Sequence, residues 1–178
     1  LPKVTLTPGK TELCVGQSTG ISASSTNTGT TYAWSPNTGL SATTGSSVTV
    51  TPPDTTTYQA IGTDFKGCKD TTTVKINVRA VFAISAATSD SLKYCQANSI
   101  NSFIKATITP DRASTITWFN GTTLIPTATT KDFTATTVGQ YKVVVSDGVC
   151  DATSNIIDIS LFPRPAITFD KPNPSAIC

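Results

Sequence analysis

The chain is built from short runs in which apolar and polar residues alternate, separated by turns rich in Gly, Pro, Asn and Asp. Such alternation predicts β-strands with one buried face and one solvent-exposed face. No stretch places apolar residues at helical spacing over three turns. The pattern therefore predicts an all-β protein. In the first half it predicts a strand at residues 3–7, a second strand entered by the turn at 15–17, and strands at 32–34, 48–51, 58–63 and 72–78. In the second half it predicts strands at 82–86, 102–109, 115–119, 133–136, 140–146 and 155–161.

The same order of aromatic residues occurs twice. In each copy a Trp opens a short strand, and a Tyr begins a later alternating run that ends in a Gly-containing turn. The alternation turns these rings inward, where one large residue between two sheets dominates the packing of a small β-domain. A sugar-stacking platform would need exposed rings instead. We therefore expect four core aromatic residues: Trp34, Tyr58, Trp118 and Tyr141.

The repeat also predicts the domain boundaries. Two units of roughly 80 residues fit the length of the chain, and we place them at residues 1–79 and 80–162. Residues 165–178 imitate residues 2–14 with one residue inserted, which predicts that residues 163–178 form the first strand of a truncated third unit and that the chain is part of a longer array. No Gly/Ser-rich spacer separates the units, so we expect a restricted, end-to-end arrangement.

Composition narrows the possible functions. The net charge is only +2 and Lys and Arg are scattered, whereas nucleic-acid binding needs a clustered basic face. There is no His, and no nucleophile or phosphate-binding motif, so we expect no enzyme activity, no cofactor and no metal-binding residue. No apolar run is long enough to span a bilayer. Five Cys at corresponding places in repeated units favour disulfides and an oxidising compartment.

Four motifs together resemble a known class of repeat. They are C-V-G-Q at 14–17, Y-A-W-S-P at 32–36, T-T-Y-Q-A-I-G-T-D-F-K-G-C at 56–68 and the closing V-K-I-N-V at 74–78. Their order is similar to that of the Ig-like and PKD-like repeats in large secreted surface proteins of Bacteroidetes, including gliding-motility adhesins and proteins exported by type IX secretion. The resemblance implies tandem Ig-like β-sandwiches at the cell surface or in the secreted fraction.

The resemblance also implies a disulfide pairing within each unit, Cys14 with Cys68 and Cys95 with Cys150. Each bond would close a loop of ~55 residues and stabilise its unit by about 4 kcal/mol. Strand geometry argues against it, because in an antibody-like topology Cys14 lies at the opposite end from the last hairpin, and bonded Cα atoms must be within about 7 Å. The alternative pairing joins successive units, Cys68 to Cys95 and Cys150 to Cys178.

Modification sites are implied in the same way. Asp54-Thr55-Thr56, Asp70-Thr71-Thr72 and Asp90-Ser91-Leu92 are similar to the O-glycosylation pattern of these bacteria. Thr55, Thr71 and Ser91 are therefore the glycan candidates, and ordinary exposed turn residues are the alternative interpretation.

Loop residues near the last hairpins are the remaining candidates. Asp64, Asp147 and Asp151 could contact a cation, but they lack the dense spacing of a calcium loop. Phe65 is an apolar residue at an expected loop tip, where it could contact a neighbouring domain or tuck inward.

These observations predict a non-catalytic structural or adhesive module that forms a semi-rigid stalk. Its expected partners are neighbouring repeats of the same chain, with extracellular polysaccharide or surface proteins as further candidates. The alternative is a carbohydrate-binding or spacer accessory of a secreted polysaccharide-degrading enzyme.

Overall fold

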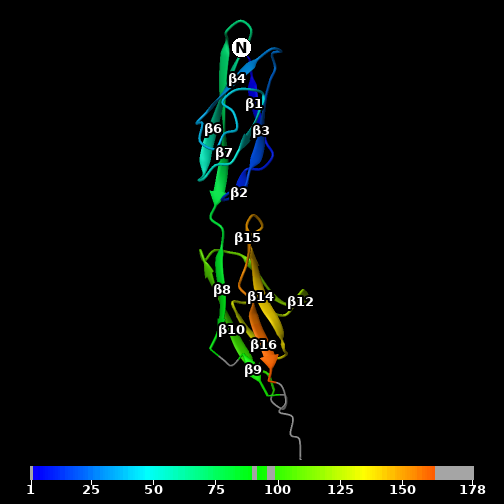
Figure 1. The fold of residues 1–178 in the computed structure, drawn as a ribbon. Helices are drawn as coiled ribbons and strands as arrows, with labels where there is room; N and C mark the ends of the chain where they lie inside the picture. Colours follow the sequence, from blue (N-terminus) through cyan, green and yellow to red (C-terminus); the bar gives the residue numbers. More distant parts are fainter. Residues whose placement is uncertain (1, 90–91, 96–98, 163–178) are drawn as a thin grey trace, which may run out of the picture.

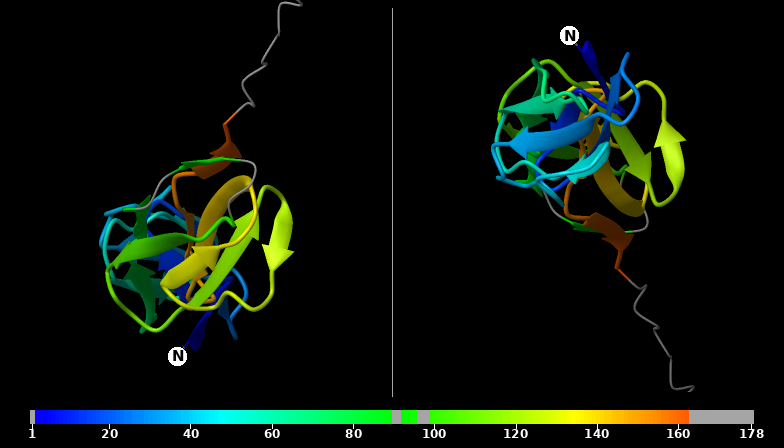
Figure 2. Two further views of the ribbon diagram at one scale, coloured as in Figure 1. Left: turned by 90° about the horizontal axis from the view of Figure 1, so that it is seen from below. Right: turned by 90° about the horizontal axis from the view of Figure 1, so that it is seen from above.

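Two β-sandwiches lie end to end along one axis (Figure 1). The computed structural model describes residues 2–89, 92–95 and 99–162. Within this part every regular element is a strand, and no helix has the length and apolar character needed to cross a membrane. Seen along the long axis, one sandwich lies behind the other (Figure 2). The expected strand of a third unit, at 163–178, lies outside the described residues.

The first sandwich, called unit one below, has a three-stranded sheet in the order β1-β3-β5 and a four-stranded sheet in the order β2-β7-β6-β4. Both sheets are antiparallel apart from the β2-β7 pair, which is parallel. The strands are β1 Val4–Pro8, β2 Glu12–Cys14, β3 Thr19–Ser25, β4 Thr31–Ser35, β5 Ser47–Val50, β6 Thr56–Thr63 and β7 Lys69–Arg79.

The second sandwich, unit two, repeats this plan with one sheet in the order β8-β10-β13 and another in the order β12-β11-β14-β16-β9. The last strand of unit two is interrupted, so that two shorter strands, β15 and then β16, pair with different parts of β14. The strands are β8 Ala83–Thr88, β9 Lys93–Tyr94, β10 Ser102–Thr109, β11 Thr115–Asn120, β12 Thr123–Ile125, β13 Asp132–Ala135, β14 Gly139–Ser146, β15 Asp151–Thr153 and β16 Ile157–Leu161.

The opening segment of each unit is split between the two sheets. β1 pairs with β3, the chain turns after Pro8, and β2 then crosses to pair with β7. β8 and β9 divide in the same way between β10 and β16. The alternation did not predict β2 and β9, because strands of two or three residues are too short to show a period. Their crossing places Cys14 beside the final residue of β7.

Each unit has its own hydrophobic core around a Trp and a Tyr. Trp34 and Tyr58 are buried in unit one, and Trp118 and Tyr141 in unit two. Each indole N–H donates to a backbone carbonyl, that of Gly45 or Thr130, at 2.8 Å. The buried polar ends of these rings are therefore satisfied, as a core position requires. The predicted tandem β-sandwich is confirmed.

We expect Trp118→Ala to destabilise unit two by about 3–5 kcal/mol, because the fully buried ring fills the space between the sheets. Chemical denaturation followed by circular dichroism measures the loss. The matched control is Phe65→Ala, which removes an exposed ring and should change stability by less than about 0.5 kcal/mol. Similar losses for the two variants would contradict the assignment of the core.

Candidate functional site: the junction between the two sandwiches

The junction lies where β7 ends at Arg79 and β8 begins at Ala83. A disulfide joins Cys14 of unit one to Cys150 of unit two, with a Cα–Cα distance of 5.6 Å. Cys14 ends β2 at the lower end of unit one, while Cys150 lies in the hairpin between β14 and β15 at the upper end of unit two (Figure 1). The bond therefore connects the facing ends of the two sandwiches.

The expected pairing within each unit was wrong. Cys68 precedes the first residue of β7, and Cys14 pairs with the last. Because β7 has eleven residues and a strand rises about 3.3 Å per residue, these two cysteines lie at opposite ends of unit one. The argument from strand geometry, which placed Cys14 and the last hairpin at opposite ends of the unit, therefore gave the correct objection to this pairing.

The alternative pairing was wrong as well. Cys68 and Cys95 are both free, Cys68 before β7 at the upper end of the pair of sandwiches and Cys95 after β9 at the lower end (Figure 1). Cys150 is bonded to Cys14, and the other partner proposed for it, Cys178, lies outside the described residues. A disulfide does join the two units, but through partners that the sequence patterns did not indicate.

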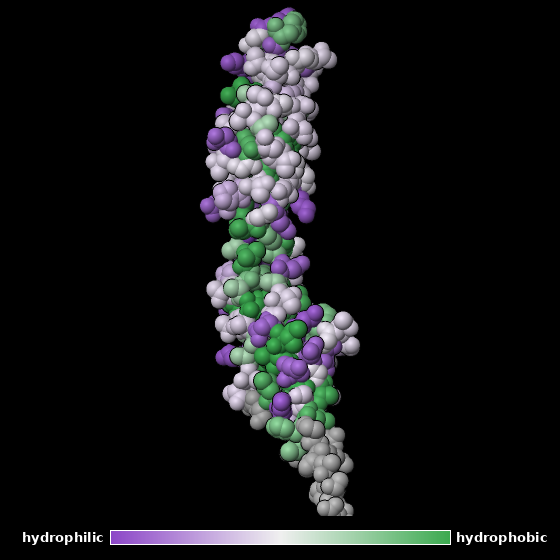
Figure 3. Space-filling view, in the orientation of Figure 1, coloured by the Kyte–Doolittle hydropathy of each residue, from purple (hydrophilic) through white to green (hydrophobic). Residues whose placement is uncertain are grey.

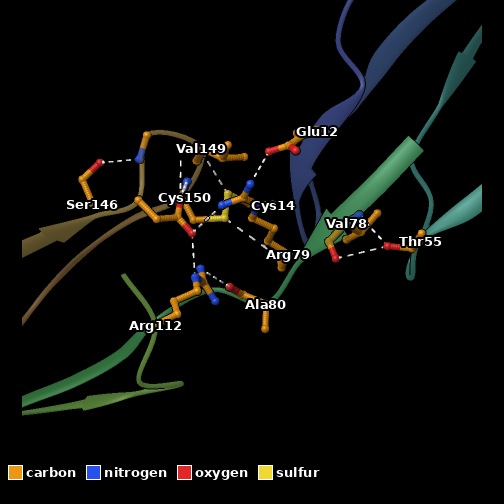
Figure 4. A network of polar contacts seen from close by, with 12 residues as sticks. Glu12, Cys14, Thr55, Val78, Arg79, Ala80, Arg112, Ser146, Val149 and Cys150 are labelled. Atoms are coloured by element: carbon orange, nitrogen blue, oxygen red, sulfur yellow. Dashed lines mark hydrogen bonds and ion pairs between the residues drawn. A yellow bond between two sulfur atoms is a disulfide. The ribbon is translucent and has the colours of Figure 1, made fainter. Parts of the chain in front are cut away.

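Charged side chains surround the disulfide. Arg79 forms ion pairs with Glu12 in its own unit and with Asp147 across the junction, at 3.4 Å in the second case. Arg112 donates to the same Asp147 oxygen at 2.6 Å and to the carbonyl oxygen of Ala80 at 2.8 Å. Both arginines point toward the hairpin that carries Cys150 (Figure 4). The network therefore ties both units and the linker to one carboxylate.

Asp147 is held ionised by this environment. Its side chain is 2% exposed. The backbone amides of Cys150 and Val149 donate to its Oδ1 at 2.8 and 3.0 Å. The Cys150 amide first, and then the Val149 amide and Arg112, lower the pKa of Asp147 far below its usual range, although burial opposes them. A buried carboxylate with this many donors is a fixed anchor for the hairpin.

Apolar contacts close the junction. Cys14, although part of unit one, packs with Cys150 and Phe82 in the hydrophobic core of unit two. The Arg112 guanidinium lies 3.9 Å from the centroid of the Phe82 ring, a cation–π contact that fixes the last linker residue. Apolar surface gathers around the joint and over unit two, whereas unit one is more polar (Figure 3). The junction is thus a packed interface rather than a hinge.

The other acidic candidates are not brought together. Asp64 lies in the β6–β7 hairpin of unit one, and Asp151 is an exposed residue that begins β15. Burial raises the pKa of Asp64, but the amides of Cys68 and Lys66 and the Asn27 side chain outweigh it and leave the pKa below its usual value. Within the described residues no three His, Cys, Asp or Glu side chains are grouped as metal ligands. Asp64 and Asp147 instead organise their hairpins.

Two of the three glycan candidates, Thr55 and Thr71, lie in unit one. Thr55 is exposed, and its hydroxyl oxygen accepts a hydrogen bond from the Val78 amide at 2.9 Å. Thr71 is exposed on β7. Ser91 lies outside the described residues. The Thr55 hydroxyl thus ties the loop before β6 to the end of β7, whereas Thr71 lies on β7 itself.

Sequence reasoning did not identify Arg79, Arg112 or Glu12 as junction residues. Their charges are spread over the chain and meet only because Arg79 ends β7 and Arg112 lies in the β10–β11 loop. One feature of the sequence could have pointed to the junction: Arg79 lies at the boundary between the units, next to a linker without a flexible spacer.

Comparisons with solved structures confirm the fold. The chain is similar to an I-band fragment from titin (15% identity, TM-score 0.51, covering 90% of this chain and 66% of that one) and to extracellular domains 3–5 of Drosophila OTK (13% identity, TM-score 0.57, covering 90% and 62%). It also matches a chain in the structure of the mouse coronavirus receptor-binding domain complexed with its murine receptor (13% identity, TM-score 0.53, covering 90% and 100%). This chain thus spans about two thirds of the length of the titin and OTK fragments.

No family model matches the sequence, and no curated protein matches it either. At these identities the likeness shows the fold alone: tandem Ig-like β-sandwiches.

We expect the stability of unit two to fall as the pH drops below about 4. The folded pKa of Asp147 is depressed, so its contribution is present above the unfolded pKa and is lost as the pH falls toward the folded one. Asp147→Asn should weaken this dependence and cost about 1.5–3 kcal/mol at neutral pH. Thermal unfolding at a series of pH values tests both effects, and Asp151→Asn, in the same hairpin but exposed, is the control. An unchanged pH profile in Asp147→Asn would contradict the role of this carboxylate.

We expect the double variant Cys14→Ser/Cys150→Ser to keep both sandwiches folded, since each has its own core, but to loosen the angle between them. Small-angle scattering should show a broader distribution of maximum dimensions than in the parent chain. Cys68→Ser, which removes a thiol outside the junction, should leave the scattering unchanged. Identical curves for the double variant and the parent would mean that the ion pairs alone fix the joint.

Proposed function

We propose that this chain is a non-catalytic structural segment of an extracellular adhesive stalk. The observation that carries the proposal is the covalent and ionic closure of the junction, where the Cys14–Cys150 bond is surrounded by the Arg79, Arg112 and Asp147 network. A joint of this kind keeps two sandwiches end to end and transmits load without slack. Flexible attachment would need a longer or Gly/Ser-rich spacer.

The position of the disulfide adds mechanical protection. The bond joins two cysteines that are 136 residues apart in the sequence. A force applied to the two chain ends is therefore transmitted directly from Cys14 to Cys150. Only β1 and β2 at one end and β15 and β16 at the other lie outside the closed loop. Most of both sandwiches is therefore shielded from extension, as a load-bearing stalk requires.

The disulfide and the sequence resemblance support the setting that we propose for the stalk. Disulfides persist in oxidising compartments, which supports a cell-surface or secreted location. The resemblance to Bacteroidetes repeats supports a parent protein of the gliding-motility adhesin or type IX secreted kind, with neighbouring repeats as its first partners and O-glycans at Thr55, Thr71 or Ser91. Extracellular polysaccharide or surface proteins are the further partners that we propose for such an array.

A sugar-binding accessory role receives less support. Trp34 and Trp118, the rings best suited to stack on a sugar, are buried and use their N–H groups internally. Their burial favours the structural role over a carbohydrate platform.

Single-molecule force spectroscopy tests the stalk function. Pulled from its two ends, the oxidised chain should release only the sandwich residues outside the loop, 2–13 and 151–162, about 80 Å, whereas the Cys14→Ser/Cys150→Ser chain should release about 550 Å. The parent chain in reducing agent is the second control and should behave like the double variant. Equal extension in the oxidised and reduced states would remove the mechanical basis of the proposal.

A further inference from the structure

Among the residues that the structure describes, two cysteines are free, and they lie at the two outer ends of the pair of sandwiches. Cys68 is half-buried in the β6–β7 hairpin at the upper end, and Cys95 is exposed after β9 at the lower end. Neither has a role in the junction described above. Nevertheless, Cys68 has the same place in unit one that Cys150 has in unit two, and Cys95 has the same place in unit two that Cys14 has in unit one.

The hairpin of Cys68 matches the hairpin of Cys150. Asp64 Oδ1 accepts from the Lys66 and Cys68 amides, both at 2.9 Å. Asp147 Oδ1 accepts from the amides of Val149 and Cys150 in the same way. In both hairpins the Asp amide also donates to the cysteine carbonyl, at 2.9 Å in unit one and 3.1 Å in unit two. Unit one thus carries at its upper end the hairpin that unit two uses at the junction.

The short strand at Cys95 matches the short strand at Cys14. Cys14 ends β2 and Cys95 directly follows β9, and each of these short strands runs parallel to the last strand of its unit. The register is also the same, because Asn77 N donates to Thr11 O at 2.8 Å and Ser160 N donates to Leu92 O at 2.9 Å, three residues before Cys14 and Cys95 respectively. The lower end of unit two therefore presents its cysteine as the lower end of unit one does.

We propose that Cys95 of one copy of this two-domain chain forms a disulfide with Cys68 of a second copy docked head to tail. The inference rests on the proposed stalk function, and the Cys14–Cys150 bond is its direct precedent, since the same two kinds of position are already bonded inside this chain. The reaction is an oxidation: the two thiols lose two protons and two electrons to a small-molecule disulfide, which is reduced to two thiols.

The two outer ends carry the apolar groups that such a junction would cover. At the upper end Phe65 is 77% exposed and, with Asn27, Asp64 and Cys68, lines a surface hollow of about 560 Å³. At the lower end Leu161 and Phe162 are exposed. The register places Phe162 where unit one has Arg79, so aromatic packing would take the place of the Arg79–Asp147 ion pair. Exposed apolar groups on both faces fit a contact between copies.

Disulfide exchange between two single-thiol variants tests the proposal. The first, Cys95→Ser/Cys178→Ser, keeps the thiol of Cys68, and the second, Cys68→Ser/Cys178→Ser, keeps that of Cys95; both retain the Cys14–Cys150 bond. Each variant alone and an equimolar mixture are incubated with oxidised and reduced glutathione, and dimers are followed by non-reducing electrophoresis and peptide mapping. Docking raises the effective concentration of the matched thiols, so the mixture should form dimer about tenfold faster than either variant alone.

A further variant separates docking from thiol reactivity. Phe65→Ala in the first variant should slow dimer formation in the mixture, while the reaction of Cys68 with a small thiol reagent stays unchanged. Equal rates in all three incubations, faster symmetric dimers, or no mixed dimer would each overturn the proposal. Because the force measurement on a single chain does not involve Cys68 or Cys95, its result stands independently of this one.

Discussion

The covalent bond between Cys14 and Cys150 is the constraint on which the arrangement of this protein depends. Each sandwich can bury its own Trp and Tyr without help from the other. These separate cores do not fix the angle between the two sandwiches. The disulfide constrains that angle by joining the end of β2 to the hairpin after β14. In the chain-entropy model a loop of this length also stabilises the folded pair by about 5 kcal/mol, so the bond contributes to stability as well as to shape.

The electrostatics of the junction follow from the same geometry. Once the hairpin of Cys150 is held against unit one, Asp147 lies within reach of Arg79 from β7 and of Arg112 from its own unit. Its remaining oxygen is occupied by two backbone amides. A buried carboxylate is tolerated only when it is paired and hydrogen-bonded in this way. The ion pairs are therefore local to the joint and hold the two facing ends together beside the disulfide.

The internal repeat gives the structure its directional character. Each unit places one cysteine position at each end, a hairpin at the upper end and the end of a short parallel strand at the lower end. Two such units in sequence satisfy one upper and one lower position at their shared junction, leaving one of each kind at the outer ends. The proposed head-to-tail contact would be heterologous, and because the two sandwiches lie along one axis (Figure 1), its repetition would extend a filament rather than a compact oligomer.

The sequence by itself determined the all-β class, the tandem organisation and the inward position of the Trp residues, because these depend on local alternation and on a repeat that is visible in one dimension. It also indicated through strand geometry that Cys14 and Cys68 belong to opposite ends of one unit. Only the tertiary structure decided which cysteines meet, since Cys14 and Cys150 are 136 residues apart and are brought together by the crossing of β2 and the stacking of two separate sandwiches. The same holds for Arg79, Arg112 and Asp147: pairing between distant charges depends on where strands end in space, which no local pattern encodes.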